Sequence, residues 1–150
     1  MQVKGTATLS APRGKVWATL MDGEALRGCL PGVQRFEPVG DSQWEATMTV
    51  GLAGIKGTYS GKVGITDRQP ETSYRLNVEG QGSGNRVRGS GLITLEDAPN
   101  GGTLVSYDGD AQIAGVLAAV GQRLFQPAAR MLADQFFNCM GSRVTAGGSV

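Results

Sequence analysis

The C-terminal part of this sequence constrains its fold most strongly. After a long series of short strands and glycine turns, the residues from Ala114 to Met140 read AGVLAAVGQRLFQPAARMLADQFFNCM. Apolar residues recur there in steps of three and four, at positions 113, 116, 117, 120, 124, 128, 131, 132 and 136, which predicts one long amphipathic helix kinked at Pro127. Such a helix is expected to lie across the sheet, and a strongly curved sheet would then enclose a cavity beneath it.

The segments before this helix alternate between apolar and polar residues, which is typical of half-buried strands. We expect a first strand over 2–9, and then two short helices, one beginning at an N-cap on Ser10 and one running from Asp22 to a stop before Pro31. Six further strands follow near 33–38, 44–50, 58–65, 74–79, 87–95 and 103–111. Because the connections are short, successive strands should pair as antiparallel hairpins, with an Asn-Gly turn in 97–102 and turns at Gly54 and in 79–84.

Glycine is unusually frequent, with 24 residues, and several glycines fall inside strand patterns. They are Gly57, Gly61, Gly64, Gly89, Gly91 and Gly109. One interpretation is a sheet that coils around a bound molecule. The other is close packing of the helix backbone onto the sheet, and the sequence leaves both open.

Composition excludes several classes of function. The sequence has no histidine, which removes serine–histidine triads, histidine bases and histidine-ligated metals. A formal charge of +1 with scattered basic residues argues against a nucleic-acid partner. No segment approaches twenty consecutive apolar residues, and the N-terminus lacks an apolar signal core, so we expect neither a transmembrane helix nor secretion.

The two cysteines are far apart and form no metal-binding pair. Cys29 and Cys139 are therefore expected to be reduced thiols of a cytoplasmic protein, although spacing alone does not exclude a disulfide. The acidic residues lie at turns or on the polar phase of their strands, so no acid–base pair is indicated and no catalytic residue is predicted. We expect no cofactor and no bound metal.

The strand alternation and the helical spacing predict which side chains line the cavity. From the strands they are Trp44, Met48, Val50, Tyr59, Val63, Tyr74, Leu76, Val78, Val105 and Tyr107, and from the helix Val116, Val120, Leu124, Met131 and Leu132. The three tyrosines could offer hydroxyls to a ligand carbonyl or could be satisfied by backbone and water. Arg86 and Arg88 share one strand face, either exposed or turned inward toward an anionic group.

This order of elements resembles the helix-grip superfamily of START and polyketide-cyclase-like proteins, and within it the family of the carbon monoxide dehydrogenase G-type subunit. The resemblance covers residues 1 to about 140 and rests on VWATLMDGEALRGCLPGV, GLAGIKGTYSGKVGITD, GSGLITL and GGTLVSYDGDAQIAGVLAAVGQRLFQPAARMLADQFF taken in order. It implies an α+β helix-grip fold, in which a seven-stranded curved antiparallel sheet grips the C-terminal helix around an apolar cavity. It also supports Leu30, Pro31 and Gly32 as a rim at the cavity mouth, beyond a simple helix stop.

Members of this family accompany molybdenum-dependent carbon monoxide dehydrogenase-type enzymes in assembly, membrane association or electron transfer. The resemblance therefore implies a non-enzymatic binding protein for a quinone- or lipid-like molecule, accessory to such an enzyme. A cyclase- or hydratase-like enzyme and an assembly chaperone with an incidental cavity are the alternatives. Many members continue into a membrane-binding end, whereas this sequence stops at Val150, so we expect only peripheral contact with the inner face of the membrane. The expected domain spans 1–141, with a flexible tail over 142–150.

Overall fold

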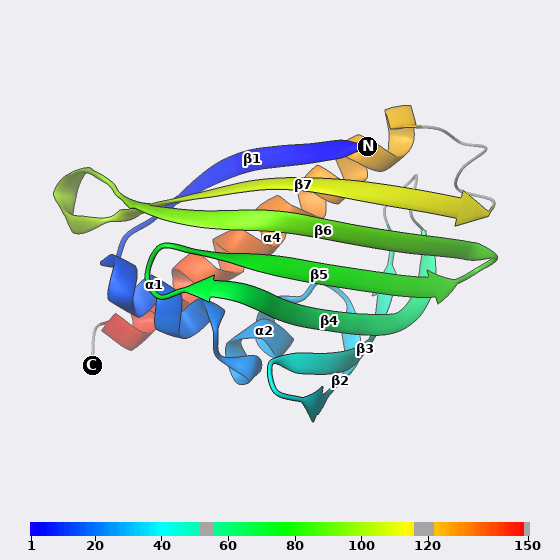
Figure 1. Cartoon of the computed structure of the whole chain (residues 1–150), viewed down its shortest axis with the longest axis horizontal. Helices are drawn as coiled ribbons and strands as arrows, with labels where there is room; N and C mark the ends of the chain where they lie inside the picture. Colours follow the sequence, from blue (N-terminus) through cyan, green and yellow to red (C-terminus); the bar gives the residue numbers. More distant parts are fainter. Residues whose placement is uncertain (52–55, 116–121, 149–150) are drawn as a thin grey trace.

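A computed structural model describes residues 1–51, 56–115 and 122–148 of the chain. It contains one seven-stranded antiparallel sheet in the order β1-β7-β6-β5-β4-β3-β2, curved around a long C-terminal helix (Figure 1). The strands are β1 (Gln2–Leu9), β2 (Val33–Gly40), β3 (Gln43–Val50), β4 (Gly57–Gln69), β5 (Ser73–Gly82), β6 (Asn85–Asp97) and β7 (Thr103–Gly115). The helices are α1 (Arg13–Leu20), α2 (Gly23–Cys29), a short 3₁₀ turn (Pro99–Gly101) and α4 (Gln122–Gly148).

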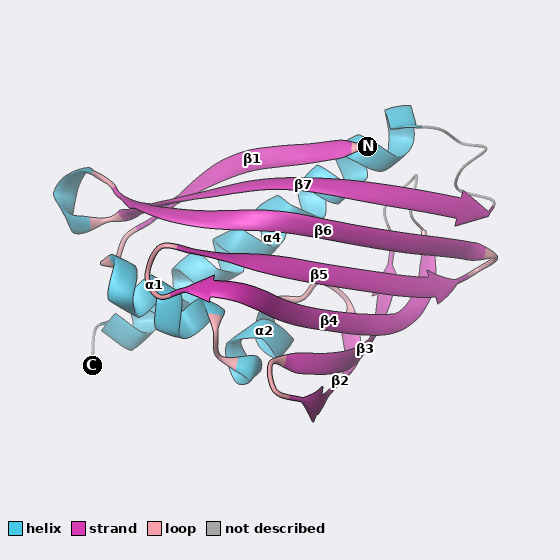
Figure 2. Ribbon diagram, viewed as in Figure 1, coloured by secondary structure: helices cyan, strands magenta, loops and turns pink. Residues whose placement is uncertain are grey.

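The expected strand order is confirmed, and the later strands are longer than the sequence predicted. Consecutive strands β2 to β7 pair as hairpins (Figure 2). Strand β1 is added at the edge of the sheet, where it pairs with β7 from Gln2 opposite Asp110 to Leu9 opposite Thr103. The turn expected in 97–102 contains Asn100 and Gly101, both with positive φ, as an Asn-Gly turn requires. The segment 79–84 forms the end of β5 and a tight hairpin turn, as expected. The turn expected at Gly54 lies outside the described residues.

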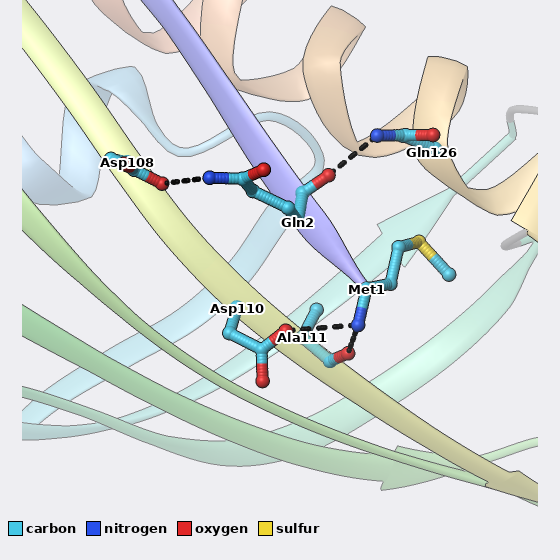
Figure 3. A network of polar contacts seen from close by, with 6 residues as sticks. All are labelled: Met1, Gln2, Asp108, Asp110, Ala111 and Gln126. Atoms are coloured by element: carbon cyan, nitrogen blue, oxygen red, sulfur yellow. Dashed lines mark hydrogen bonds and ion pairs between the residues drawn. The ribbon is translucent and has the colours of Figure 1, made fainter.

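Polar contacts fasten the start of β1 to both β7 and α4 (Figure 3). The Met1 amino group lies 2.9 Å from Asp110 Oδ1, and Gln2 Nε2 donates to Asp108 Oδ1 at 2.9 Å. Gln126 of α4 donates from Nε2 to the carbonyl oxygen of Gln2. The edge strand β1 therefore holds the N-terminal half of α4 against the sheet.

Helices α1 and α2 pack beside the C-terminal half of α4 and cover one end of the sheet (Figure 1). Asp22 is the N-cap of α2, since its carboxylate accepts from the Glu24 amide at 3.2 Å. The expected cap on Ser10 is wrong, because α1 begins after Pro12 and has no side-chain cap. Proline is tolerated at this position because the N–H groups at the start of a helix have no intrahelical acceptor, so the missing N–H of Pro12 costs no hydrogen bond.

A disulfide joins Cys29 at the end of α2 to Cys139 of α4, with a Cα–Cα distance of 5.4 Å. The expectation of two reduced thiols is therefore wrong. The spacing of 110 residues along the chain said nothing about this pairing, because only the packing of α2 onto α4 brings the two cysteines together.

The long helix is confirmed, but both of its ends differ from the prediction. Ile113, Ala114 and Gly115 belong to β7, where they pair with Val87, Arg86 and Asn85 of β6. The sheet ladder thus overrides the local helical spacing at these positions. At the other end α4 continues through 142–148, where a flexible tail was expected, and Val144 is buried.

The main core lies between α1, α2, the C-terminal half of α4 and the covered end of the sheet. It includes the fully buried Val16, Leu20, Val105 and Met140. A smaller cluster of Val50, Phe125 and Ala128 lies under the start of α4. Apolar packing is therefore concentrated toward the two ends of the helix.

Candidate functional site

A cavity of about 400 Å³ lies between the inner face of the sheet and α4. Its walls come from β3 to β7, from Val3 of β1, from α2 with the loop after it, and from α4. Its apolar and aromatic lining residues are Val3, Leu26, Leu30, Pro31, Met48, Val50, Tyr59, Val63, Tyr74, Leu76, Val78, Val87, Ile93, Tyr107, Ala111, Phe125, Ala129, Leu132, Ala133, Phe136 and Phe137. Ser60, Lys62, Glu79, Ser90 and Asp110 also border the cavity, but most of its wall is apolar, which is the character of a pocket for an apolar molecule.

Glycines on the inner face explain why this space is open. Gly61, Gly80, Gly89, Gly91 and Gly109 sit in neighbouring strands and form the floor of the cavity. A Cβ placed on Gly80 would find only Tyr59 Cβ and the Ser60 carbonyl oxygen within 4 Å, at 3.8 and 3.9 Å. A Cβ on Gly89 would meet only Val78 and the Asp110 carbonyl oxygen within that distance.

Of the described part of α4, no atom is therefore within 4 Å of either position. At Gly80 and Gly89 the glycines do not serve close helix packing, the second interpretation left open by the sequence. They leave an unfilled volume beneath the helix.

Three tyrosines line the cavity, and their environments differ. Tyr74 is almost fully buried, its ring packs edge-on against Trp17 at 5.7 Å, and burial raises the pKa of its hydroxyl strongly. The Tyr107 ring stacks on Phe137 at 5.4 Å. Tyr59 accepts a hydrogen bond on Oη from Asn85 Nδ2 at 3.5 Å.

The hydroxyl of Tyr107 points to the seam between β1 and α4. A Cβ on Gly5 of β1 would clash with this oxygen, and Asp134 and Arg130 of α4 lie nearby. Burial and the negative charge of Asp134 raise the pKa of Tyr107, and Arg130 opposes them. The oxygen is buried and makes no well-formed hydrogen bond with any described residue.

One known protein family matches this chain along nearly its whole length. A family model for the G-type subunit of carbon monoxide dehydrogenase (CoxG) matches residues 5–145. The chain belongs to the CoxG family. A comparison with curated proteins gives no significant match.

Solved structures share the CoxG-family fold seen here. A conserved protein from Geobacillus kaustophilus is similar with a TM-score of 0.92 and 29% identity, over 97% of this chain and 96% of that one. A START superfamily protein from Mycobacterium smegmatis has a TM-score of 0.73 and 14% identity over 97% of both chains. A point mutant of norcoclaurine synthase from Thalictrum, in complex with a transition-state analogue, has a TM-score of 0.69 and 12% identity, over 99% of this chain and 96% of that one.

The START-like fold is thus established, and family and fold together suggest a ligand-binding accessory protein. The last two structures are too distant in sequence to show more than the fold. Among the helices of the described residues, none is long and apolar enough to cross a membrane.

Most of the predicted lining residues of this CoxG-family chain do lie on the cavity wall. They are Met48, Val50, Tyr59, Val63, Tyr74, Leu76, Val78, Tyr107 and Leu132, together with the rim residues Leu30 and Pro31. Alternation along the strands located the inner face correctly. Whether these residues bind a ligand stays a prediction.

Three predicted residues lie elsewhere for reasons of packing. Trp44 is buried against Phe36, with the rings stacked at 5.4 Å, and Val105 is fully buried in the main core. Both are on the inner face, but at the end of the sheet that α1 and α2 fill. Gly32 is not on the wall, and its φ of +68° places it in a turn where a Cβ would strike the Thr49 carbonyl oxygen.

Only part of the predicted helix stripe faces the sheet, since Ala128 is buried and Leu132 and Phe136 line the cavity. Leu124 and Met131 were expected to face the cavity, yet they are 48% and 49% exposed. The buried side of α4 instead runs through Phe125, Ala129 and Phe136. Because Leu124 and Met131 are seven residues apart, they lie on one line of the helix and turn outward together. Val116 and Val120 lie outside the described residues.

Several lining residues were not predicted. Val3 and Ile93 lie on the apolar phase of β1 and β6 and could have been found from alternation. Phe136 belongs to the predicted helical stripe but was not named as a lining residue, whereas Phe125 and Ala129 lie outside that stripe. Leu26 lines the cavity because α2 folds over the sheet, for which no local signal exists.

Charged side chains lie on the outer face of the sheet. Arg86 and Arg88 flank Val87, which lines the cavity, so both arginines point outward, and Arg88 Nη2 is 3.9 Å from Glu79 Oε2. Glu45 lies 3.7 Å from Arg35. Among the described residues, no group of three histidine, cysteine, aspartate or glutamate side chains is arranged to hold a metal.

Proposed function

We propose that this CoxG-family protein binds an apolar small molecule in the cavity under α4. The observation that carries the proposal is the apolar wall with its glycine floor, because the absent side chains at Gly80 and Gly89 leave an apolar space that the protein does not fill itself. An empty apolar cavity costs stability, about 24 cal/mol for each Å³ in core-deletion series. A ligand with matching apolar surface would recover that free energy.

We infer further that the ligand is quinone- or lipid-like and that the protein is accessory to a carbon monoxide dehydrogenase-type molybdenum hydroxylase. Membership of the family supports the proposed association with the enzyme, because the family is named after a subunit of carbon monoxide dehydrogenase. The apolar wall supports the ligand class. Such ligands reside in membranes, so the proposal places the protein beside the enzyme at the inner face of the membrane.

The proposal includes no catalytic step. Glu79 and Asp110 border the cavity, but their carboxylates pair with Arg88 and with the Met1 amino group, and Asp108 accepts from Gln2. A cyclase- or hydratase-like enzyme would need an acid or base inside it. Conversion of the bound molecule by the isolated protein would overturn the non-enzymatic proposal.

A matched pair of glycine variants tests ligand binding. Gly80→Met places a side chain on the cavity floor, where a Cβ has room. Gly64→Met places the same side chain on the outer face, where a Cβ also makes only ordinary contacts, to Gln43 at 3.7 Å and Ser42 at 3.8 Å.

With decylubiquinone at about one hundred times its Kd, the free energy of unfolding of the wild type should rise by about 2.7 kcal/mol. Thermal denaturation should show the same rise for Gly64→Met and little or none for Gly80→Met. Protein purified from its own host should carry a small apolar adduct in native mass spectrometry. A cavity that consistently carries no adduct, with no stabilisation by decylubiquinone, would contradict the proposal.

The same variants separate a carrier from a chaperone with an incidental cavity. Tagged wild type and Gly64→Met should capture the molybdenum hydroxylase from the host and support its activity, whereas Gly80→Met should support less activity. Equal support by both variants would favour the chaperone alternative.

A further inference from the structure

A polar pair, formed by Tyr59 of the cavity wall and Asn85 beside it, lies near the turn that joins β5 to β6. Asn85, the first residue of β6, is one of two buried polar residues in the described part of the chain. Its Nδ2 donates to the Ser83 carbonyl oxygen at 3.2 Å and to Tyr59 Oη at 3.5 Å. The other, Thr103, donates to the Ala11 carbonyl oxygen at 2.7 Å and is explained by that structural bond.

The Tyr59 ring is held in place by its surroundings. It packs with the cluster of Val50 and Phe125, and it lies beside Gly80 and Gly82, which have no side chains to displace it. The ring therefore has a fixed place on the cavity wall, and the hydroxyl has a fixed place beside Asn85.

The direction of the hydrogen bond leaves the Tyr59 proton available. The amide nitrogen Nδ2 can only donate, so the Tyr59 oxygen accepts from Asn85 and its own O–H must point elsewhere. No described residue receives this proton in a hydrogen bond. A ligand oxygen in the apolar cavity could accept this proton and would itself gain a partner that the apolar wall does not otherwise supply.

The other two tyrosines do not offer the same arrangement. Tyr107 contributes its ring to the wall, but its oxygen lies in the seam near Gly5 and Asp134. Tyr74 is packed in the main core beside Trp17. Tyr59 alone among the three has a buried amide that fixes its oxygen as an acceptor.

We propose that Tyr59 Oη donates a hydrogen bond to a carbonyl-type oxygen of the bound molecule, with Asn85 as the positioning residue. The cavity would then select apolar molecules that carry such an oxygen over pure hydrocarbons of the same shape. This inference rests on the proposed function and specifies the ligand class of the same cavity. Sites built to hydrogen-bond a group discriminate strongly against analogues that lack it.

Two probes of the same shape test the inference. Methyl naphthyl ketone carries one carbonyl oxygen, and ethylnaphthalene replaces that carbonyl by a methylene group. We expect the wild type to bind the ketone more tightly. Tyr59→Phe should weaken ketone binding on the order of fivefold, as one net hydrogen bond predicts, and should change ethylnaphthalene binding by less than about twofold.

Tyr107→Phe is the matched control, since the Tyr107 ring lines the cavity but its hydroxyl lies in the seam between β1 and α4. It should leave the ratio of the two affinities unchanged, and melting temperatures should verify that both variants are folded. Equal weakening of both probes by Tyr59→Phe, or no weakening of either, would overturn the role of Tyr59 while leaving the proposed function intact. Failure of the folded wild type to bind either probe or decylubiquinone would instead overturn the proposed function.

Discussion

At the scale of single residues, the cavity depends on which glycines lack side chains and on what surrounds each one. Gly61 of β4 and Gly80 of β5 are direct cross-strand partners on the inner face. A Cβ on Gly61 would overlap the Glu79 carbonyl group, whereas a Cβ on Gly80 would meet nothing closer than 3.8 Å. The first glycine is required for close approach of two strands, and the second is required only to keep the space open.

This contrast predicts opposite tolerance at paired positions. Gly61→Ala should lower the free energy of unfolding by about 1–3 kcal/mol, because the strands must separate to accept the methyl group. Gly80→Ala should be neutral or stabilising by about 0.5–1 kcal/mol, because alanine costs less backbone entropy than glycine in a strand. Urea denaturation measures both, and similar destabilisation by the two variants would show that the floor is packed at Gly80 as well.

At the scale of elements, the sequence predicted the presence of each strand and helix better than the face that α4 buries. Period-two alternation is a property of the strand itself, so Met48, Val63 and Leu76 were placed correctly. On α4, apolar residues occupy two adjacent lines of the helix. Packing against β1 and α2 selects the line that includes Phe125 and leaves Leu124 exposed.

Adjacent residues of α4 should therefore respond very differently to substitution. Leu124→Gln should change the free energy of unfolding by less than about 0.5 kcal/mol, because the side chain is half exposed. Phe125→Ala should lower it by about 3–5 kcal/mol, because Phe125 is only 4% exposed. Chemical denaturation of the two variants checks the helix phase, and a larger effect at Leu124 would mean that the predicted stripe was right.

At the scale of the whole molecule, the disulfide between Cys29 and Cys139 ties α2 to α4 across a sequence separation of 110 residues. Leu26 of α2 and Phe136 of α4 each lie three residues before a cysteine of this disulfide, and both line the cavity. The bond therefore joins two parts of the wall that the sheet does not connect directly. Disulfides are typical of oxidising compartments, which makes the redox state in the host informative about location.

Removal of this bond should destabilise the protein without changing its fold. The double variant Cys29→Ser, Cys139→Ser should lose about 2–5 kcal/mol of unfolding free energy, because a long loop in the unfolded chain is no longer closed. Dithiothreitol should destabilise the wild type similarly and leave the double variant unaffected. An equal response of both proteins to dithiothreitol would contradict the bond, and thiol alkylation in intact host cells would report its state there.

The sequence by itself determined the order of elements, the antiparallel sheet and the inner face of each strand, because periodicity and turn chemistry are local properties of the chain. Only the tertiary structure decided that Trp44 and Val105 are core while Met48 and Tyr59 line a cavity, although all four lie on the same face. That difference depends on where α1 and α2 cover the sheet. The disulfide, the buried side of α4 and the Tyr59–Asn85 pair likewise arise only when distant segments come together.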